Sequence, residues 1–401
     1  MPVITTEHPT REVARYLRGI EFSVTAMDEK ILQVVVPSFR IDIEREIDLV
    51  EEVARLVGYN AMPTSQPSIR MDYPKRDELR VLRQETARIL TAQGFFEAIN
   101  YSFVAETHLD LCRLPENDQR RRVTRLLNPL SEEQAIMRSM LLPGLLENIR
   151  RNINFQHPDI RLFETGKVFL QLEPNTLPEE RLHLCAVISG HRYPEAEPLH
   201  YSNQEADFFD IKGAATNLFR ALRVIGTDNS SLFQYNETLV QPYSDLACAL
   251  IIMNDNQMIG TLGAVHPETL KNFGIKQPVY FLEIDLQLLL TLEKETKQFK
   301  ALPRYPSVKR DISLVVPDHV PAGELLQAIQ THQQKYLESA DIFDVYRGKP
   351  IRAGYKSVAL SITYRSPTAT LDDQSVDKMH EKIVSSLMAD FNARYREGFE
   401  E

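Results

Sequence analysis

Residues 246–265 read LACALIIMNDNQMIGTLGAV, which is two apolar runs joined by Asn254, Asp255 and Asn256. Apolar runs of this length on either side of a short Asn/Asp turn predict a β-hairpin. A tight hairpin joins antiparallel strands, because parallel neighbours need a longer crossover connection. The stretch therefore predicts an antiparallel sheet in the middle of the chain.

The sequence around this hairpin supplies further strands and the helices that would cover them. Apolar runs predict additional strands at 160–170, 182–188 and 279–286. Apolar residues at helical spacing predict helices at 77–93, 145–153 and 207–224, with an extended segment at 97–104. Hairpins interspersed with helices are typical of an α+β core in which an antiparallel sheet is backed by helices, and not of a doubly wound parallel sheet.

The last part of the chain has a different order of elements. It predicts strand, helix, strand, strand and helix at 311–316, 322–330, 340–346, 356–364 and 373–391. This order is four-fifths of a ferredoxin-like unit. A closing strand should follow, but residues 392–401 are polar and rich in acids. We expect that strand to be irregular or missing.

The first part predicts a small helical domain with a wing-like hairpin. A helix is expected at 11–18, a strand at 30–36, and a second helix at 47–57 that Gly58 ends. Two proline clusters, at 62–74 and 302–306, separate this part from the core and the core from the last part. The chain is therefore expected to have three domains.

Composition limits the functions open to this chain. Its net charge is −10, whereas proteins that bind RNA by neutralising phosphates are usually basic, so any RNA contact must be local. Cys112, Cys185 and Cys248 form no CxxC pair, which favours a reducing cytosol and argues against a disulfide scaffold or a zinc site. No apolar run is long enough to span a bilayer, and the first residues lack the features of a signal peptide. These observations predict a soluble cytoplasmic protein.

Four carboxylates near residue 50 form the most specific chemical pattern. Asp48, Glu51 and Glu52 are spaced i, i+3 and i+4, so they share one helical face, and Asp42 precedes them. Mg²⁺ takes oxygen ligands and would relieve the repulsion between these like charges. The spacing alone favours a solvated acidic face on which Arg55 pairs with Glu51.

The segments 36–43 (VPSFRIDI) and 48–60 (DLVEEVARLVGYN) resemble the B5 domain of bacterial-type phenylalanyl-tRNA synthetase β subunits. In that family the two Asp and the paired Glu residues bind magnesium. The resemblance therefore implies a Mg²⁺ site whose ligands are Asp42, Asp48, Glu51 and Glu52. The expected opening strand of this domain is missing from the sequence.

The middle of the chain continues the resemblance. Its matching segments are 128–131 (NPLS), 137–146 (MRSMLLPGLL), 161–169 (RLFETGKVF), 263–267 (GAVHP) and 282–285 (LEID). The resemblance implies a class II synthetase-like antiparallel core that is catalytically inert. An active class II site needs an arginine two residues before a motif 2 glutamate, but Leu162 stands two residues before Glu164, and the glycine-rich arginine motif is also absent near 279–286. We therefore expect no catalytic residue, and a structural or interface role for Arg138 and Glu164.

The end of the chain resembles the ferredoxin-fold anticodon-binding domain of the same family, at 304–312 (RYPSVKRDI), 343–348 (FDVYRG) and 356–360 (KSVAL). Between residues 345 and 366 there are five cationic side chains and no acid. Basic and aromatic residues beside an open sheet face suit single-stranded RNA, although a solvated hairpin would have the same pattern. The candidate RNA-binding residues are Arg347, Lys349, Arg352, Lys356, Arg365, Tyr346 and Tyr355.

Together these patterns predict a B5-like domain at 1–67, a class II synthetase-like core at 73–300 and an anticodon-binding domain at 304–397. The resemblance implies a non-catalytic part of phenylalanyl-tRNA synthetase that docks a catalytic α subunit in an (αβ)₂ tetramer and binds tRNA(Phe), while the α subunit uses ATP. The helices at 79–93 and 144–153 are candidate docking surfaces, and both could equally be internal core. The alternative function is a stand-alone RNA- or protein-binding module.

Overall fold

The structure is a computed structural model of the chain. It describes residues 9–26, 28, 31–62, 72–73, 75–173, 176–193, 203–224, 232–254, 257–299, 301–331 and 335–396. The chain divides into two compact units, residues 1–84 and 85–401. The proline cluster predicted at 62–74 lies largely outside the described residues.

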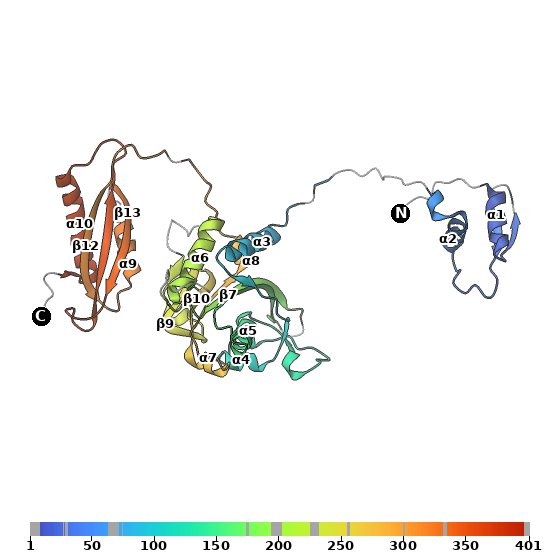
Figure 1. The fold of residues 1–401 in the computed structure, drawn as a ribbon, viewed down its shortest axis with the longest axis horizontal. Coiled ribbons are helices and arrows are strands. Elements are labelled where there is room, and N and C mark those ends of the chain that lie inside the picture. Colours follow the sequence, from blue (N-terminus) through green and yellow to red (C-terminus); the bar gives the residue numbers. More distant parts are fainter. Residues whose placement is uncertain are drawn as a thin grey trace. The chain divides into compact units, whose positions relative to one another are not determined.

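The first unit has the predicted helices and hairpin (Figure 1). Its elements are α1 (Thr10–Gly19), β1 (Ser23–Ala26), β2 (Leu32–Val35) and α2 (Glu46–Val57), followed by a 3₁₀ turn at Tyr59–Ala61. Strands β1 and β2 are antiparallel, and Leu17, Phe22 and Val24 form a small core under the helices. Helix α2 ends at Gly58, whose φ of 95° lies in the region that favours glycine. Helix α3 (Glu78–Thr91) crosses the boundary between the two units.

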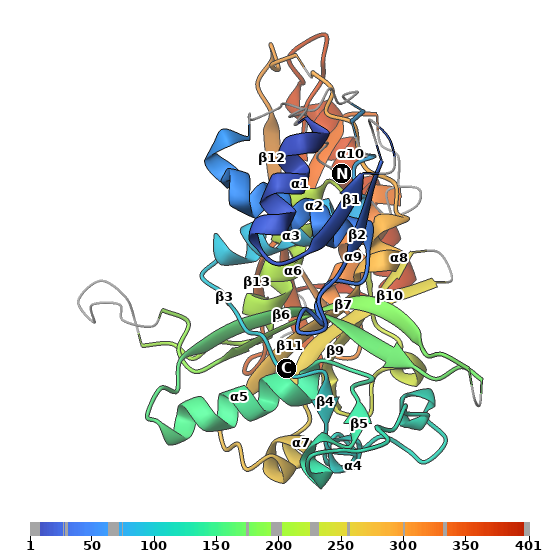
Figure 2. The same cartoon turned by 90° about the vertical axis from the view of Figure 1, so that its right-hand side faces the viewer.

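The second unit contains the predicted antiparallel core (Figure 2). Among the described residues, one sheet has the strand order β3-β6-β7-β11-β10-β9-β8, and its neighbours are antiparallel except for the pair β3 and β6. These strands are β3 (Phe96–Glu97), β6 (Ile160–Leu170), β7 (Glu179–Ser189), β8 (Phe233–Gln234), β9 (Ser244–Asn254), β10 (Gln257–Val265) and β11 (Val279–Asp285). The predicted hairpin is the β9–β10 pair, in which Asn254 faces Gln257.

Helices cover both faces of this sheet. On one face, α5 (Leu142–Asn154) packs on β6 and β7, and Val187 and Phe281 belong to the same buried cluster. On the other face, α6 (Phe208–Leu222) packs on β7, β10 and β11. Figure 2 shows the two helices on opposite sides of the sheet. The α+β fold class predicted from sequence is confirmed.

Several short elements were not predicted. They are α4 (Thr107–Leu111), the 3₁₀ turns at Gln119–Arg121, Glu132–Gln134 and Glu237–Leu239, the paired strands β4 (Phe103–Val104) and β5 (Ile136–Met137), α7 (Pro267–Asn272) and α8 (Leu286–Leu290). Leu286, predicted to end a strand, begins α8 instead. The reason is that the Asp285 carboxylate accepts the amides of Gln287 and Leu288 at 2.9 and 3.1 Å and so caps the helix.

The last part has the ferredoxin-like strand order β13-β14-β12-β15. Its elements are β12 (Val308–Pro317), α9 (Ala322–Thr331), β13 (Leu337–Tyr346), β14 (Tyr355–Tyr364), α10 (Asp373–Phe391) and β15 (Arg394–Tyr395). The closing strand is therefore present but short, and it pairs with β12 at Leu314 and Val315. Val358, Leu360, Ile362 and Tyr364 enter the core with residues of α9 and α10, as the alternation along this strand predicted. The intervening Ser357, Ala359 and Thr363, expected on an open face of the sheet, are buried as well, at 3%, 6% and 8% exposure. No helix in the described part of the chain is long and apolar enough to cross a membrane.

Candidate docking, metal and RNA sites

Arg138 and Glu164 form a buried ion pair in the core. Arg138 Nη1 lies 2.5 Å from Glu164 Oε1, and the two side chains are only 7% and 3% exposed. Arg138 also donates to the carbonyl oxygen of Lys167 at 2.9 Å. Gly166 leaves room for this guanidinium, since a Cβ there would lie 2.1 Å from Arg138 Nη2. The structural ion pair expected from sequence is confirmed.

Hydrogen bonds to Glu164 and Arg138 also hold the segment between β3 and β4 in place. Asn100 donates its side-chain amide to Glu164 Oε2 at 2.8 Å and its backbone amide to Glu164 Oε1 at 3.3 Å. The Arg138 amide donates to the Ser102 carbonyl oxygen at 2.9 Å. Because Asn100 and Ser102 are held inward, their neighbours in this extended segment are directed outward.

The outward side chains form an exposed apolar ridge, which we define as Ile99, Tyr101 and Phe103. Ile99 is 89% exposed and Tyr101 is 75% exposed. Three large apolar side chains within five residues exceed the scattered exposure that is normal on a protein surface. The alternation Ile99, Tyr101, Phe103 was visible in the sequence, but it predicted only an extended segment.

The helices that sequence offered as docking surfaces have a different role. In α5, Leu145, Leu146 and Ile149 are fully buried in the core cluster. In α3, Ile89 and Leu90 are also buried. Of the two interpretations that the sequence left open, internal core is the one that applies to these apolar residues. Leu162, which stands where an active site would need arginine, packs against the same cluster as α5.

The four carboxylates near α2 are held by arginines and backbone amides. Arg40 Nη2 lies 2.7 Å from Asp42 Oδ2 and 2.8 Å from Glu52 Oε1, and Arg55 also pairs with Glu52. Hydrogen bonds from these guanidinium groups lower the pKa of Asp42 and Glu52. Asp48 accepts the amides of residues 44 and 45 at 3.0 and 2.7 Å, which lowers its pKa. Glu51 is exposed.

This arrangement suits a cation but is not an assembled metal centre. The described residues contain no group of three or more His, Cys, Asp or Glu side chains placed to hold a metal ion. The donor set consists of hard carboxylate oxygens, which match Mg²⁺. Arg40, however, occupies the point between Asp42 and Glu52, so Mg²⁺ would have to displace its guanidinium. The sequence alternative of an Arg55–Glu51 pair differs from the structure, in which Arg55 binds Glu52.

The candidate RNA-binding residues fall into two groups at opposite ends of strand β14. Arg347, Lys349 and Arg352 are exposed in the β13–β14 hairpin, and Tyr346 ends β13 beside it. Arg347 pairs with Asp318 at 2.8 Å, while Tyr346 donates its hydroxyl to the Lys349 carbonyl oxygen. This group forms what we call the hairpin cluster: Tyr346, Arg347, Lys349 and Arg352.

Arg365 and Lys356 do not belong to the hairpin cluster. Arg365 follows the other end of β14, roughly 33 Å from Tyr355 at about 3.3 Å per residue, and pairs with Glu338 at 2.9 Å. Lys356 is 5% exposed, and it donates to the Asp318 carbonyl oxygen at 2.8 Å. Burial lowers the pKa of Lys356. In this conformation its ammonium group is unavailable to a phosphate. Tyr355 is half-buried at the start of β14.

The sequence interpretation missed the cations of the closing strand. Arg394 lies in β15, and the Arg396 guanidinium lies 5.3 Å from the centre of the Tyr346 ring. This distance is within the range of a cation–π contact. The signal was present as two arginines flanking Tyr395, but the acid-rich tail concealed it. The sheet face opposite α9 and α10 also carries the exposed side chains of Asp311 and Asp341, which are both paired in register with Ser361.

Family comparisons agree with these three parts. A model described as "tRNA synthetase B5 domain" matches residues 2–59, and "Ferredoxin-fold anticodon binding domain" matches residues 303–396. These matches place the chain among the aminoacyl-tRNA synthetases and their subunits. A third model, "Phenylalanyl tRNA synthetase beta chain CLM domain", matches residues 62–286, more than half of the chain. The chain belongs to the phenylalanyl-tRNA synthetase beta chain family.

Whole-protein relatives carry the same family name. The phenylalanine–tRNA ligase beta subunit of Desulfotalea psychrophila is 45% identical over 400 residues, which cover 98% of this chain and 49% of that protein. That of Geobacter sulfurreducens is 37% identical over 394 residues, covering 98% and 48%. The chain thus spans about half the length of the curated relatives it matches. A solved structure of pyrrolysyl-tRNA synthetase from Desulfitobacterium hafniense aligns with a TM-score of 0.41 and 18% sequence identity. The alignment covers 54% of this chain and 69% of that chain, and the similarity is distant.

Proposed function

We propose that this chain supports the ATP-dependent attachment of phenylalanine to tRNA(Phe) without catalysing it. In this proposal it docks a catalytic α subunit, which supplies the sites for phenylalanine and ATP, in a cytoplasmic (αβ)₂ tetramer. The B5-like, core and anticodon-binding parts then correspond to residues 1–67, 73–300 and 304–397.

The observation that carries the docking role is the exposed apolar ridge. Ile99 and Tyr101 expose large apolar side chains, while the buried Arg138–Glu164 pair fixes the backbone that presents them. A preordered apolar surface loses little conformational entropy on association. A partner that covers this ridge would remove the apolar area from water, which favours binding by about 25 cal/mol per Å² before the costs of association.

Two measurements test the proposed division of labour. The chain alone should show no phenylalanine-dependent exchange between ATP and pyrophosphate. Pull-down with a phenylalanyl-tRNA synthetase α subunit should recover a stable complex that has this exchange activity. Exchange by the isolated chain, or failure to capture any α subunit, would exclude the proposed role.

For RNA, we place the contact at the hairpin cluster. Exposed Arg347, Lys349 and Arg352 supply phosphate-binding charge, and the Tyr346 ring beneath Arg396 supplies a surface on which a base can stack. The overall charge of −10 requires such a local site. Asp311 and Asp341, on the sheet face opposite α9 and α10, repel phosphate, which favours the hairpin end of the sheet over its middle.

Neutralising the hairpin cluster should weaken tRNA binding. With Arg347→Gln and Lys349→Gln together, we expect roughly tenfold lower affinity for tRNA(Phe) at low salt, and a slope of log affinity against log salt that is smaller by about 1.4. Titration of labelled tRNA at several salt concentrations measures both. The matched control is Lys378→Gln with Lys382→Gln, which removes the same charge from α10. Equal losses in the two double variants would argue for a non-specific charge effect and against this site. Arg365→Gln, measured separately, tests the other end of β14.

We also propose that Asp42, Asp48, Glu51 and Glu52 bind Mg²⁺. The position between Asp42 and Glu52 already holds a cationic guanidinium, so the local field favours positive charge. When bound, Mg²⁺ would supply charge neutralisation to this end of the chain. Arg40 would compete with it, and the affinity for Mg²⁺ would therefore depend on how readily Arg40 leaves.

Magnesium should raise the thermal stability of the chain. A ligand present at about 100 times its Kd stabilises a protein by roughly 2.7 kcal/mol, so scanning calorimetry with and without Mg²⁺ should detect it. Asp48→Asn should abolish the increase while retaining an oxygen for the amides of residues 44 and 45. Arg40→Gln should enlarge the increase, and Glu46→Gln, on the same helix, should leave it unchanged. If Mg²⁺ does not raise the thermal stability of the native chain, or raises that of Asp48→Asn equally, the proposed site is wrong.

A further inference from the structure

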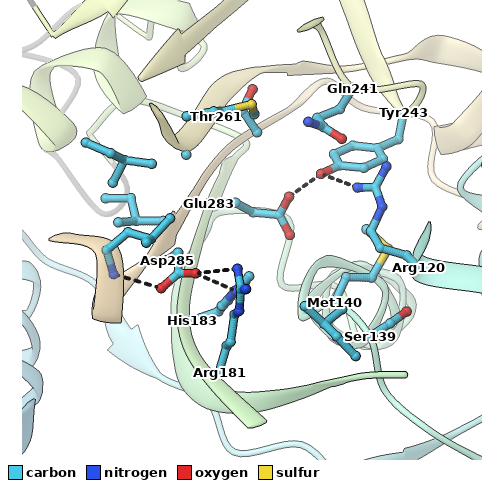
Figure 3. A pocket seen from close by; sticks show the side chains of 16 residues that line it. Arg120, Ser139, Met140, Arg181, His183, Gln241, Tyr243, Thr261, Glu283 and Asp285 are labelled. Atoms are coloured by element: carbon cyan, nitrogen blue, oxygen red, sulfur yellow. Dashed lines mark hydrogen bonds and ion pairs between the residues drawn. The ribbon is translucent and has the colours of Figure 1, made fainter. Parts of the chain in front are cut away.

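The core contains a pocket of about 230 Å³ that neither docking nor RNA binding uses. It lies on the α5 side of the sheet, where Glu283 and Asp285 point from β11 and His183 points from β7. Figure 3 shows Glu283 between two groups of side chains. One group is Tyr243 and Arg120, and the other is Asp285, His183 and Arg181. Ligand pockets for drug-sized molecules are roughly 300–1,000 Å³, so this volume restricts the ligand to a small molecule.

The cations of the pocket already have anionic partners. Arg120 donates to both oxygens of Asp118 at 2.9 and 2.6 Å. Arg181 donates to both oxygens of Glu179 at 2.9 and 3.0 Å, and its third nitrogen lies 3.6 Å from Asp285. A ligand anion would have to compete with these carboxylates.

Glu283 has no direct ion pair, and the Arg120 guanidinium acts on it only electrostatically, from the other side of the Tyr243 hydroxyl. The one hydrogen bond of Glu283 within the described part of the chain comes from the Tyr243 hydroxyl, and no described Lys, Arg or His lies within ion-pair distance of it. Burial, followed by the charge of Glu283, raises the pKa of Tyr243, which therefore remains a proton donor. A half-buried carboxylate with an open oxygen is complementary to a positively charged hydrogen-bond donor.

A second polar group in the wall also lacks a partner. Ser139 is 3% exposed, and its Oγ is buried without a hydrogen bond. A buried hydroxyl without a partner costs about 1–3 kcal/mol, but Figure 3 shows Ser139 on the opposite side of the pocket from Glu283, so this group is not part of the site around that carboxylate. Beside these polar groups the pocket is lined by the apolar side chains of Met140, Met258 and Ile259.

We propose that this pocket binds a small organic amine, with its ammonium group at Glu283 and a short apolar body against Met140, Met258 and Ile259. The ammonium group supplies the cationic donor that no described residue places within ion-pair distance of Glu283. The apolar body replaces water against the thioether and aliphatic side chains. This site is separate from the proposed docking and RNA surfaces.

The test uses n-pentylamine as the probe and the full chain labelled at its methionine methyl groups. Met140→Leu and Met258→Leu assign the two reporter signals. We expect n-pentylamine to shift both signals saturably at neutral pH, and 1-pentanol and pentanoate to bind at least about tenfold more weakly. Glu283→Gln should lower the affinity for n-pentylamine by about tenfold. Glu132 is an exposed carboxylate elsewhere in the core, and Glu132→Gln should leave this affinity unchanged.

Three outcomes would overturn the proposal. They are the absence of a saturable shift in the native chain, equal affinity for the amine and the alcohol, and unchanged amine affinity in folded Glu283→Gln. The titration of the native chain decides the question even if Glu283→Gln does not fold. Preferential binding of pentanoate would assign the pocket to anions and would also reject the amine.

Discussion

Alanine at position 164 should lower the free energy of unfolding by about 3–5 kcal/mol, because it leaves the buried Arg138 guanidinium without its carboxylate. Arg138 is 6% exposed, so water cannot replace the lost partner. The same substitution frees Asn100, whose two hydrogen bonds to Glu164 hold the segment that carries the apolar ridge. Chemical denaturation followed by circular dichroism measures the loss.

The neighbouring Lys167–Glu180 pair is the matched control. Its atoms are also 2.5 Å apart, but both side chains are about half exposed, so Glu180→Ala should cost less than about 1 kcal/mol. The double variant Arg138→Met with Glu164→Leu removes both charges and should recover part of the stability lost in Glu164→Ala. Equal effects of Glu164→Ala and Glu180→Ala would show that burial of the Arg138–Glu164 pair has no energetic consequence.

Charged substitutions in the apolar ridge should have the largest effect on assembly. Ile99→Asp with Tyr101→Asp should weaken binding of the α subunit by at least about 100-fold, since central aromatic and apolar interface residues each contribute roughly 2 kcal/mol or more. Because both side chains are largely exposed, the free energy of unfolding of the chain alone should change by less than about 0.5 kcal/mol for each substitution. Titration calorimetry with the α subunit and denaturation of the isolated chain provide the two readouts.

Leu177→Asp is the control for the apolar ridge. Leu177 is 93% exposed, so it tests whether any charge added at an exposed apolar position weakens assembly. We expect no change in affinity for that variant. Unchanged affinity in the ridge variant would remove the ridge from the interface and would leave the docking surface to be found elsewhere.

The sequence alone determined the main elements and their order. Strand 160–170, strand 257–265 and helix 373–391 have the predicted bounds. These elements were predictable because the helix has an apolar period of 3.6 residues and the two strands, buried on both faces, are short apolar runs. Both patterns are local properties of the chain. Short elements such as α8 were missed because a side-chain cap, and not periodicity, defines them.

Other features depended on contacts between residues far apart in the chain. Alternation showed that Ile99 and Tyr101 share a side, but only the hydrogen bonds of Asn100 to Glu164, 64 residues away, decided that this side faces outward. The apolar pattern of α5 is the same for a helix in the core and for a helix at an interface. Only the packing of α5 on β6 and β7 showed that its apolar residues belong to the core.

The carboxylates near α2, and separately the pocket around Glu283, also have some features that the sequence determined and others that only tertiary contacts decided. The i, i+3 and i+4 spacing determined that Asp48, Glu51 and Glu52 share a face, because the helical repeat is local. The spacing did not determine which cation lies beside them. In the tertiary structure Arg40, from the preceding loop, forms an ion pair with Glu52. Likewise, sequence placed Glu283 on a strand, but only the register of β7, β10 and β11 gathered the residues around it and left it without a direct ion pair. Local periodicity therefore specified the elements, and long-range packing specified the chemistry of the sites.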